Sequence, residues 1–192
     1  MGIYLVSVGA KEWFGEEEGD WGATAAALNR ELKQRGLPPY LSVPEEAVFV
    51  RGSGQSFEEK LVPSMDGFGA LCEAHLSTEE ADSLCRWTVL VPVPLDKDVW
   101  LPADAGYDVI AGAPRILALA ERLAGAIGLP ADIPAACDNL QLTGWFLDGA
   151  AEGRAATRPG PWSEDLGTAF YVALFLRAAQ HSIRRGCPIV YS

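Results

Sequence analysis

Four carboxylates lie between two tryptophans in the stretch WFGEEEGDWG, residues 13–22. Such a cluster has three chemical uses: a site for a hard cation, a catalytic acid pair, or a charged surface for a basic partner. The spacing does not match the Asp and Asn pattern of a calcium loop. A catalytic pair needs two carboxyls whose pKa values are separated by burial, which adjacent glutamates among glycines do not favour. We therefore predict neither a metal site nor a catalytic pair in this stretch.

The same stretch combines charge with aromatic side chains, as protein interfaces do. Aromatic anchors provide much of the binding energy of an interface, and the charges at its rim set the association rate. A simpler interpretation is that the acids stabilise the positive end of a following helix, with Asp20 as its N-cap and Trp21 on its apolar side. Our prediction is a docking site for a basic partner, made of Trp13, Phe14, Glu16, Glu17, Glu18, Asp20 and Trp21.

Cys72 and His75 are the second group with potential chemistry, because they lie three residues apart on a predicted helix. They could share a helix face as a thiolate–imidazole pair or as half of a zinc site. A structural zinc needs two further ligands, and the only other histidine, His181, is far away in the sequence. The alternative is a buried cysteine beside a half-buried histidine. The four cysteines form no C-x-x-C pair, so we expect free thiols.

Residues 130–162 lack a sustained period and are rich in Gly, Ala and Pro, which predicts a long irregular loop before the C-terminal helix. Such loops in compact domains usually have a function. One interpretation is a surface connection held by its tryptophans, and the other is a lid over a small-molecule pocket. The residues of this alternative pocket are Cys72, His75, Asp138, Asn139, Trp145, Arg158 and Trp162.

The elements that must position these residues alternate between strands and helices. Runs of β-branched and aromatic residues predict strands at 3–8, 40–43, 47–50, 87–95, 107–112 and 187–192. Helical spacing and capping residues predict helices that begin near residues 21, 64, 78, 114 and 163. The pattern predicts an α/β or α+β fold in a single domain, residues 1–192. Its mixed sheet should have about five to six strands with helices packed on it.

Net charge is the most informative bulk property. The chain carries −11, and residues 1–100 contain 17 acidic and 8 basic side chains. A field of this sign repels phosphate backbones and anionic membranes, so we expect neither nucleic acid nor a membrane as a partner. No apolar run reaches the roughly 20 residues that span a bilayer, and no signal-type segment opens the chain. We therefore expect a cytoplasmic location.

No common hydrolase, kinase, metalloprotease or nucleotide-binding motif is present, which lowers the expectation of catalysis without excluding it. We predict a non-enzymatic, acidic cytoplasmic protein, without cofactor, metal or catalytic residue, that inhibits or sequesters a basic protein. The analogy is with immunity proteins for secreted toxins, and it rests on charge and size alone. The alternative is an enzyme or small-molecule-binding domain with its pocket under the 130–162 loop.

Overall fold

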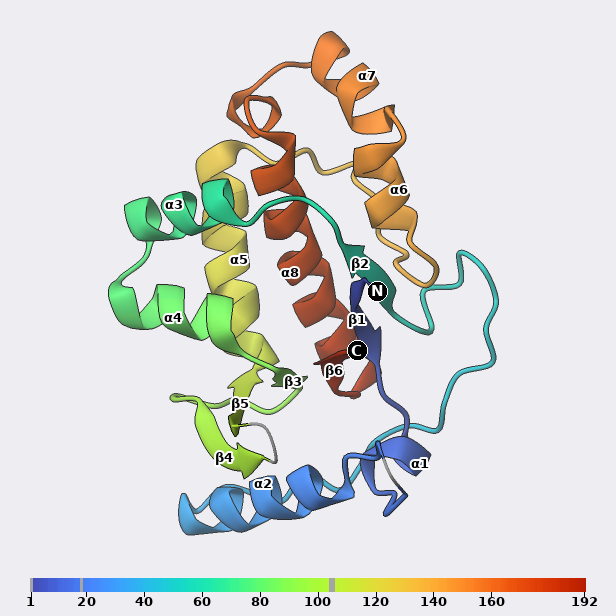
Figure 1. The fold of residues 1–192 in the computed structure, drawn as a ribbon, viewed down its shortest axis with the longest axis vertical. Helices are drawn as coiled ribbons and strands as arrows, with labels where there is room; N and C mark the ends of the chain where they lie inside the picture. The colour runs from blue at the N-terminus through green and yellow to red at the C-terminus, as the bar shows by residue number, and fades with distance from the viewer. Residues whose placement is uncertain (1, 18, 104–105) are drawn as a thin grey trace.

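One mixed β-sheet carries the other elements. In a computed structural model that describes residues 2–17, 19–103 and 106–192, six strands lie in the order β2-β1-β6-β3-β5-β4 (Figure 1). Strands β3 and β5 pair in parallel, and the other neighbours are antiparallel. The strands are β1 (Ile3–Ser7), β2 (Glu58–Leu61), β3 (Val89–Val91), β4 (Val99–Ala103), β5 (Gly106–Gly112) and β6 (Ile189–Tyr191). The predicted single-domain α/β fold with a mixed sheet is confirmed.

Helices cover both faces of the sheet. Helices α5 and α8 pack on one face with α3, α4 and α6 around them, and α1 and α2 pack on the other, at the lower end of Figure 1. The described residues form α1 (Ala10–Trp13), α2 (Gly22–Gln34), α3 (Asp66–His75), α4 (Thr78–Arg86), α5 (Ala113–Ile127), α6 (Gln141–Leu147), α7 (Ala150–Thr157), the 3-10 helix η1 (Pro161–Ser163) and α8 (Leu166–Arg185).

Each face of the sheet has its own apolar core. Successive side chains of a strand point to opposite faces, so Leu90 joins the core with α5 and α8, while Val89 and Val91 join the core with α2. In the same way, Ile189 and Val190 of β6 belong to opposite cores. Burial on both faces explains why these strands read as continuous apolar runs.

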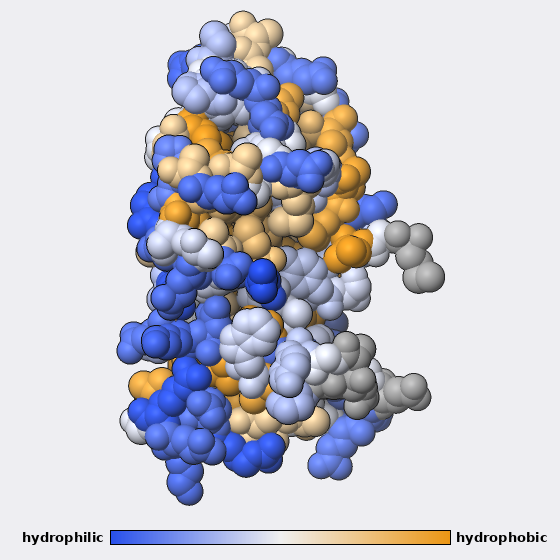
Figure 2. Space-filling view, turned by 60° about the vertical axis from the view of Figure 1, so that its left-hand side comes forward, coloured by the Kyte–Doolittle hydropathy of each residue, from blue (hydrophilic) through white to orange (hydrophobic). Residues whose placement is uncertain are grey.

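Hydrophilic and apolar residues are unevenly distributed over the surface of the molecule. Figure 2, turned so that the left-hand side of Figure 1 comes forward, shows hydrophilic residues over the lower end, where α2 lies, and apolar patches higher up. Helix α2 buries Ala25, Leu28 and Leu32. It therefore closes one core with its apolar stripe and presents polar side chains to solvent.

The strands predicted at 40–43 and 47–50 are wrong. Residues 35–57 form no helix or strand, and this 23-residue connection leads directly into β2. The sequence 47–50, AVFV, has a high β-propensity, but no strand of the described residues pairs with it. Propensity alone does not form a strand, because a strand needs a partner for its backbone groups.

The segment 130–162 is not the irregular loop expected from its composition, because it contains α6, α7 and η1. Helix α6 begins after Leu140, whose φ of 57° is left-handed. Its first free N–H groups are bonded by the carboxylate of Glu59 in β2, 83 positions before Leu142. A cap from so distant a residue leaves no local signal in the sequence.

Candidate functional site

Residues 41–56, which we call the strap, cross the surface between two buried aromatic residues. Before the strap, Tyr40 exchanges two hydrogen bonds with the Asn29 side chain. After it, the Phe57 N–H donates to Ser7 Oγ at 2.9 Å, and the Ser7 N–H donates to the Phe57 carbonyl. Figure 1 shows part of the strap as a cyan trace that stands away from the sheet and the helices. Irregular segments fixed at both ends are typical of binding loops.

The carboxylate of Asp138, in the segment before α6, holds the last part of the strap. Its Oδ1 accepts from the Gly52 N–H at 3.0 Å, and its Oδ2 accepts from the Gly54 N–H at 2.9 Å. Ser53 and Gln141 side chains donate to the same carboxylate. Burial raises the pKa of Asp138, but these hydrogen bonds outweigh it, and the net shift is downward. The N–H groups of this glycine turn are therefore occupied by one of the protein's own carboxylates.

Three consecutive apolar residues, Val48, Phe49 and Val50, form what we call the strap tip. Their side chains are 83%, 55% and 58% exposed. Among the described residues, none makes a hydrogen bond to the backbone of residues 45–49. The Val50 carbonyl accepts from the Ser53 N–H at 3.0 Å, so the strap-tip residues whose backbone donor and acceptor both lack a partner among the described residues are Val48 and Phe49.

Carboxylates surround the base of the strap where it passes α1. The Ala10 N–H, at the start of α1, donates to the Pro44 carbonyl at 2.8 Å and joins the two segments. Burial raises the pKa of Glu12, and repulsion from the carboxylates of Asp20 and Glu46 raises it further. Carboxylates of the acidic loop, as we call residues 13–22, and of the strap therefore lie close enough to Glu12 to act on the same side chain.

The predicted docking residues of the acidic loop divide between core and surface. Trp13 is fully buried with its ring 6.0 Å from that of Tyr40, so its prediction as a docking residue is wrong. Trp21 is half-buried at the start of α2. Phe14, Glu16 and Glu17 are exposed.

Asp20 does not cap α2, which corrects a second expectation. The N-cap of α2 is Trp21, whose side chain makes no capping hydrogen bond. The Asp20 carboxylate instead accepts from the Glu17 N–H at 3.0 Å and closes a turn within the acidic loop. Glu18, the remaining predicted residue, lies outside the described residues.

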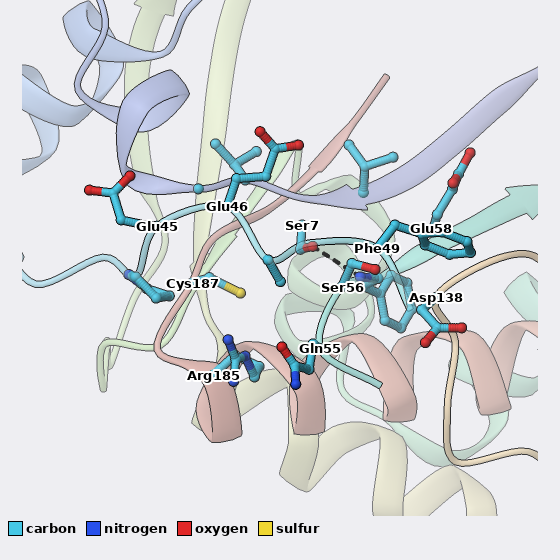
Figure 3. Close-up of a pocket in the computed structure, with 16 residues that line it drawn as sticks. Ser7, Glu45, Glu46, Phe49, Gln55, Ser56, Glu58, Asp138, Arg185 and Cys187 are labelled. Atoms are coloured by element: carbon cyan, nitrogen blue, oxygen red, sulfur yellow. Dashed lines mark hydrogen bonds between the residues drawn. The ribbon is translucent and has the colours of Figure 1, made fainter. Parts of the chain in front are cut away.

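A cavity of about 270 Å³ lies between the strap and the carboxyl end of β1. Figure 3 shows Glu45 and Glu46 on one wall, Gln55 and Arg185 on the opposite wall, and Cys187 between them. The volume is just below the roughly 300 Å³ at which small-molecule pockets begin.

The residues of the alternative pocket do not form a single site. Asn139 and Trp145 line a hollow of about 870 Å³ beside α6. Arg158 and Trp162 line a different hollow, of about 450 Å³, near the end of α7. The prediction of one pocket that contains all of these residues is therefore wrong, as is the assignment of Asp138, which binds the strap, to its wall.

Cys72 and His75 lie on α3 and line neither hollow. Cys72 is buried, whereas His75 is exposed. The Sγ of Cys72 lies 4.0 Å from the Sγ of Cys85 on α4. The side chain that Cys72 contacts is therefore a thiol and not the predicted imidazole of His75. Within the described part of the chain, no group of three or more Cys, His, Asp or Glu side chains is placed to hold a metal ion.

Sequence reasoning overlooked the strap, although one signal pointed to it. The stretch 38–46 contains three prolines and two glutamates next to the AVFV sequence. Proline and glutamate are unfavourable inside sheets, so this context favours an apolar run at the surface.

In the described ranges, no helix is long and apolar enough to cross a bilayer.

No family model, curated protein or solved structure matches the chain.

Proposed function

We propose that the chain is a non-enzymatic binding protein that docks a basic protein. The observation that carries the proposal is the exposed strap tip among carboxylates, because apolar patches rimmed by charge are typical of interaction sites. We call this the docking surface; its described members are the strap tip, Phe14, Glu16, Glu17, Glu45 and Glu46.

Charge defines the class of partner. Residues 10–20 and 41–50 together contain seven acidic side chains and one basic side chain. Two acidic docking surfaces repel one another, which disfavours a second copy of the chain as the occupant. A basic protein is attracted by the same field, and its association is accelerated.

The backbone groups of Val48 and Phe49, which have no hydrogen-bond partner among the described residues, support strand addition as the binding mode. When residues 48–50 extend against the edge of a partner sheet, backbone hydrogen bonds provide affinity. Phe49 then projects to one side of the paired strands, and Val48 and Val50 project to the other. Side-chain pockets of the partner on both sides would provide specificity.

A role in inhibition or sequestration follows from this surface, by analogy with immunity proteins that neutralise basic toxins. The analogy covers charge and size only. We place the protein in the cytoplasm, a reducing compartment that suits its four free cysteines.

Site-specific photocrosslinking tests the proposal. A benzoylphenylalanine in place of Phe49 is irradiated in native cell extract, with Trp100 of β4, which is also 55% exposed, as the matched control position. The expected result is an adduct with a basic protein from position 49 and none from position 100. Absence of an adduct at position 49, or the same adducts from both positions, overturns the proposal.

A second candidate is small-molecule binding in the 870 Å³ hollow beside α6. The specific observation is its size, which lies within the roughly 300–1,000 Å³ range of ligand pockets, together with Arg51 and Trp145 in its wall. Native mass spectrometry of the purified protein tests it. A retained ligand that the Trp145→Ala variant loses supports this function, and an unliganded mass for both proteins opposes it.

A further inference from the structure

Two thiols meet where α3 and α4 pack together. The Sγ atoms of Cys72 and Cys85 lie 4.0 Å apart, and the two helices are joined only by Leu76 and Ser77. The Ser77 hydroxyl and the Glu80 carboxylate form a capping box, which fixes the start of α4. The two sulfur atoms are therefore held together by a short and well-defined connection.

The two thiols have different environments. Cys72 is buried, whereas Cys85 is half-buried and is therefore the more accessible residue of the pair. A hydrogen bond between the thiols stabilises the Cys85 thiolate and lowers the pKa of Cys85, while the same contact and burial raise the pKa of Cys72. Partial burial of Cys85 and the Asp82 carboxylate oppose the thiolate, whereas Arg86 favours it.

The other two cysteines do not share this arrangement. Cys137 and Cys187 are buried, and burial raises the pKa of each thiol, to about 11 for Cys187. In the described part of the chain, neither makes a hydrogen bond to another thiol. Reaction of the protein with an oxidant should therefore begin at Cys85.

We propose that Cys72 and Cys85 are an oxidisable pair that closes to a disulfide when the protein meets a peroxide. The Cys85 thiolate attacks one oxygen of hydrogen peroxide, the O–O bond breaks, and the hydroxide released takes up a proton to form water. Cys85 is then a sulfenic acid. The Cys72 sulfur attacks the Cys85 sulfur, the S–O bond breaks, and the departing hydroxide takes the Cys72 proton to form a second water. Two thiols are oxidised by two electrons in total, and one peroxide is reduced.

The disulfide would link α3 covalently to α4. A disulfide bond measures about 2.05 Å, so the two sulfur atoms must approach by about 2 Å. Both helices pack against α5, so the disulfide would stabilise the packing of α3 and α4 on this side of the core. The site lies apart from the strap, and the inference does not depend on the proposed function.

Peptide mapping by mass spectrometry tests the proposal on the reduced, full-length chain treated with stoichiometric hydrogen peroxide. The expected product is a linked peptide pair that contains Cys72 and Cys85, with a mass lower by two hydrogens. The melting temperature of this form should rise by roughly 5–10 °C, because the bond restricts the unfolded chain.

Three variants make the test specific. Cys85→Ser should form no disulfide, Cys72→Ala should accumulate oxygen adducts on Cys85, and Cys187→Ser should form the disulfide as the wild type does. A Cys72–Cys85 link in the wild type, lost in the first two variants and kept in the third, supports the inference. Oxygen adducts on Cys85 of the wild type without a link, or a link through Cys137 or Cys187, overturn it.

Discussion

Glu59 is a single side chain that joins two elements. It is fully buried, its Oε1 accepts from the Leu142 N–H at 2.8 Å, and its Oε2 accepts from the N–H and the hydroxyl of Thr143. Burial raises the pKa of Glu59, and these hydrogen bonds limit the rise. The sequence offers no sign of this role, because Glu58 and Glu59 look alike until the fold buries one of them.

Replacing Glu59 with Gln should lower the free energy of unfolding by about 1–3 kcal/mol, since the amide nitrogen would face the Thr143 N–H, donor against donor. The exposed Glu58→Gln is the matched control, and its change should stay within about 0.5 kcal/mol. Urea unfolding at pH 7 measures both. Equal stabilities of the two variants would show that the buried carboxylate does not hold α6.

His181 makes stability depend on pH. It is buried in α8, and its Nε2 has no hydrogen-bond partner in the described part of the chain. Burial lowers the pKa of His181 to about 3, with Arg184 and Arg185 adding to the effect and Asp138 opposing it. The folded state therefore keeps the ring neutral at a pH where the unfolded chain binds a proton. Stability from this group is complete above about pH 6.5 and decreases as the pH falls toward 3.

The His181→Phe variant should lose this dependence. In the wild type, the group should remove up to about 1.36 kcal/mol of unfolding free energy per pH unit below pH 6.5. Glu59, whose pKa is raised, acts in the opposite sense as the pH rises above its ordinary pKa, but it is present in both proteins and cancels in their difference. Urea unfolding at pH 7, 6 and 5 measures the difference. Parallel profiles for the two proteins would contradict this account of His181.

Helices and strands were correctly predicted from the sequence where the local sequence pattern agrees with the burial found in the fold. Residues 107–112 form β5, and the helix predicted from 114 forms α5 with its apolar stripe buried. Strands β2 and β4 and helix α6 were missed because tertiary partners stabilise them: β2 and β4 pair at the sheet edges, and α6 is capped from β2. Local pattern cannot report such partners.

Asp138 should control the order of the strap. The Asp138→Ala variant leaves the N–H groups of Gly52 and Gly54 without their acceptor, so their amide hydrogens should exchange faster with solvent. The neighbouring exposed Asn139→Ala is the control and should leave this exchange unchanged. Hydrogen exchange with mass spectrometry reads both. Unchanged exchange at residues 52–54 of the Asp138 variant would show that the carboxylate does not fasten the strap.

For the whole molecule, charge could be read from the sequence and the exposure of particular side chains could not. The acidic loop was identified because charge is a sum over residues. The burial of Trp13 depends on the packing of its ring against Tyr40, which the sequence does not show. For this reason Trp13 was wrongly predicted as a docking residue. The strap tip was missed because its residues have the composition of a buried strand. The docking surface is therefore partly predicted and partly found in the fold.

Neutralising Glu16, Glu17, Glu45 and Glu46 with Gln should slow association with the protein crosslinked at position 49 by about tenfold or more at low salt. The matched control changes Glu73, Glu121, Glu152 and Glu164, which are exposed on α3, α5, α7 and the segment before α8. Both variants have the same net charge. Surface plasmon resonance over a range of salt concentrations measures the rates. Equal slowing by both sets would show that total charge acts, and not the docking surface.

The most direct test of the docking surface is retention of partners by a triple variant, Val48→Ser, Phe49→Ser and Val50→Ser. Because these side chains are exposed, the unfolding midpoint should not fall. The control variant changes Trp100 and Tyr107, exposed aromatic residues of β4 and β5, to Ser. Immobilised wild type, triple variant and control are incubated with native cell extract, and quantitative mass spectrometry measures the retained proteins. We expect a basic protein to be retained by wild type and control and to be lost on the triple variant. The same proteins at the same levels on all three would contradict it.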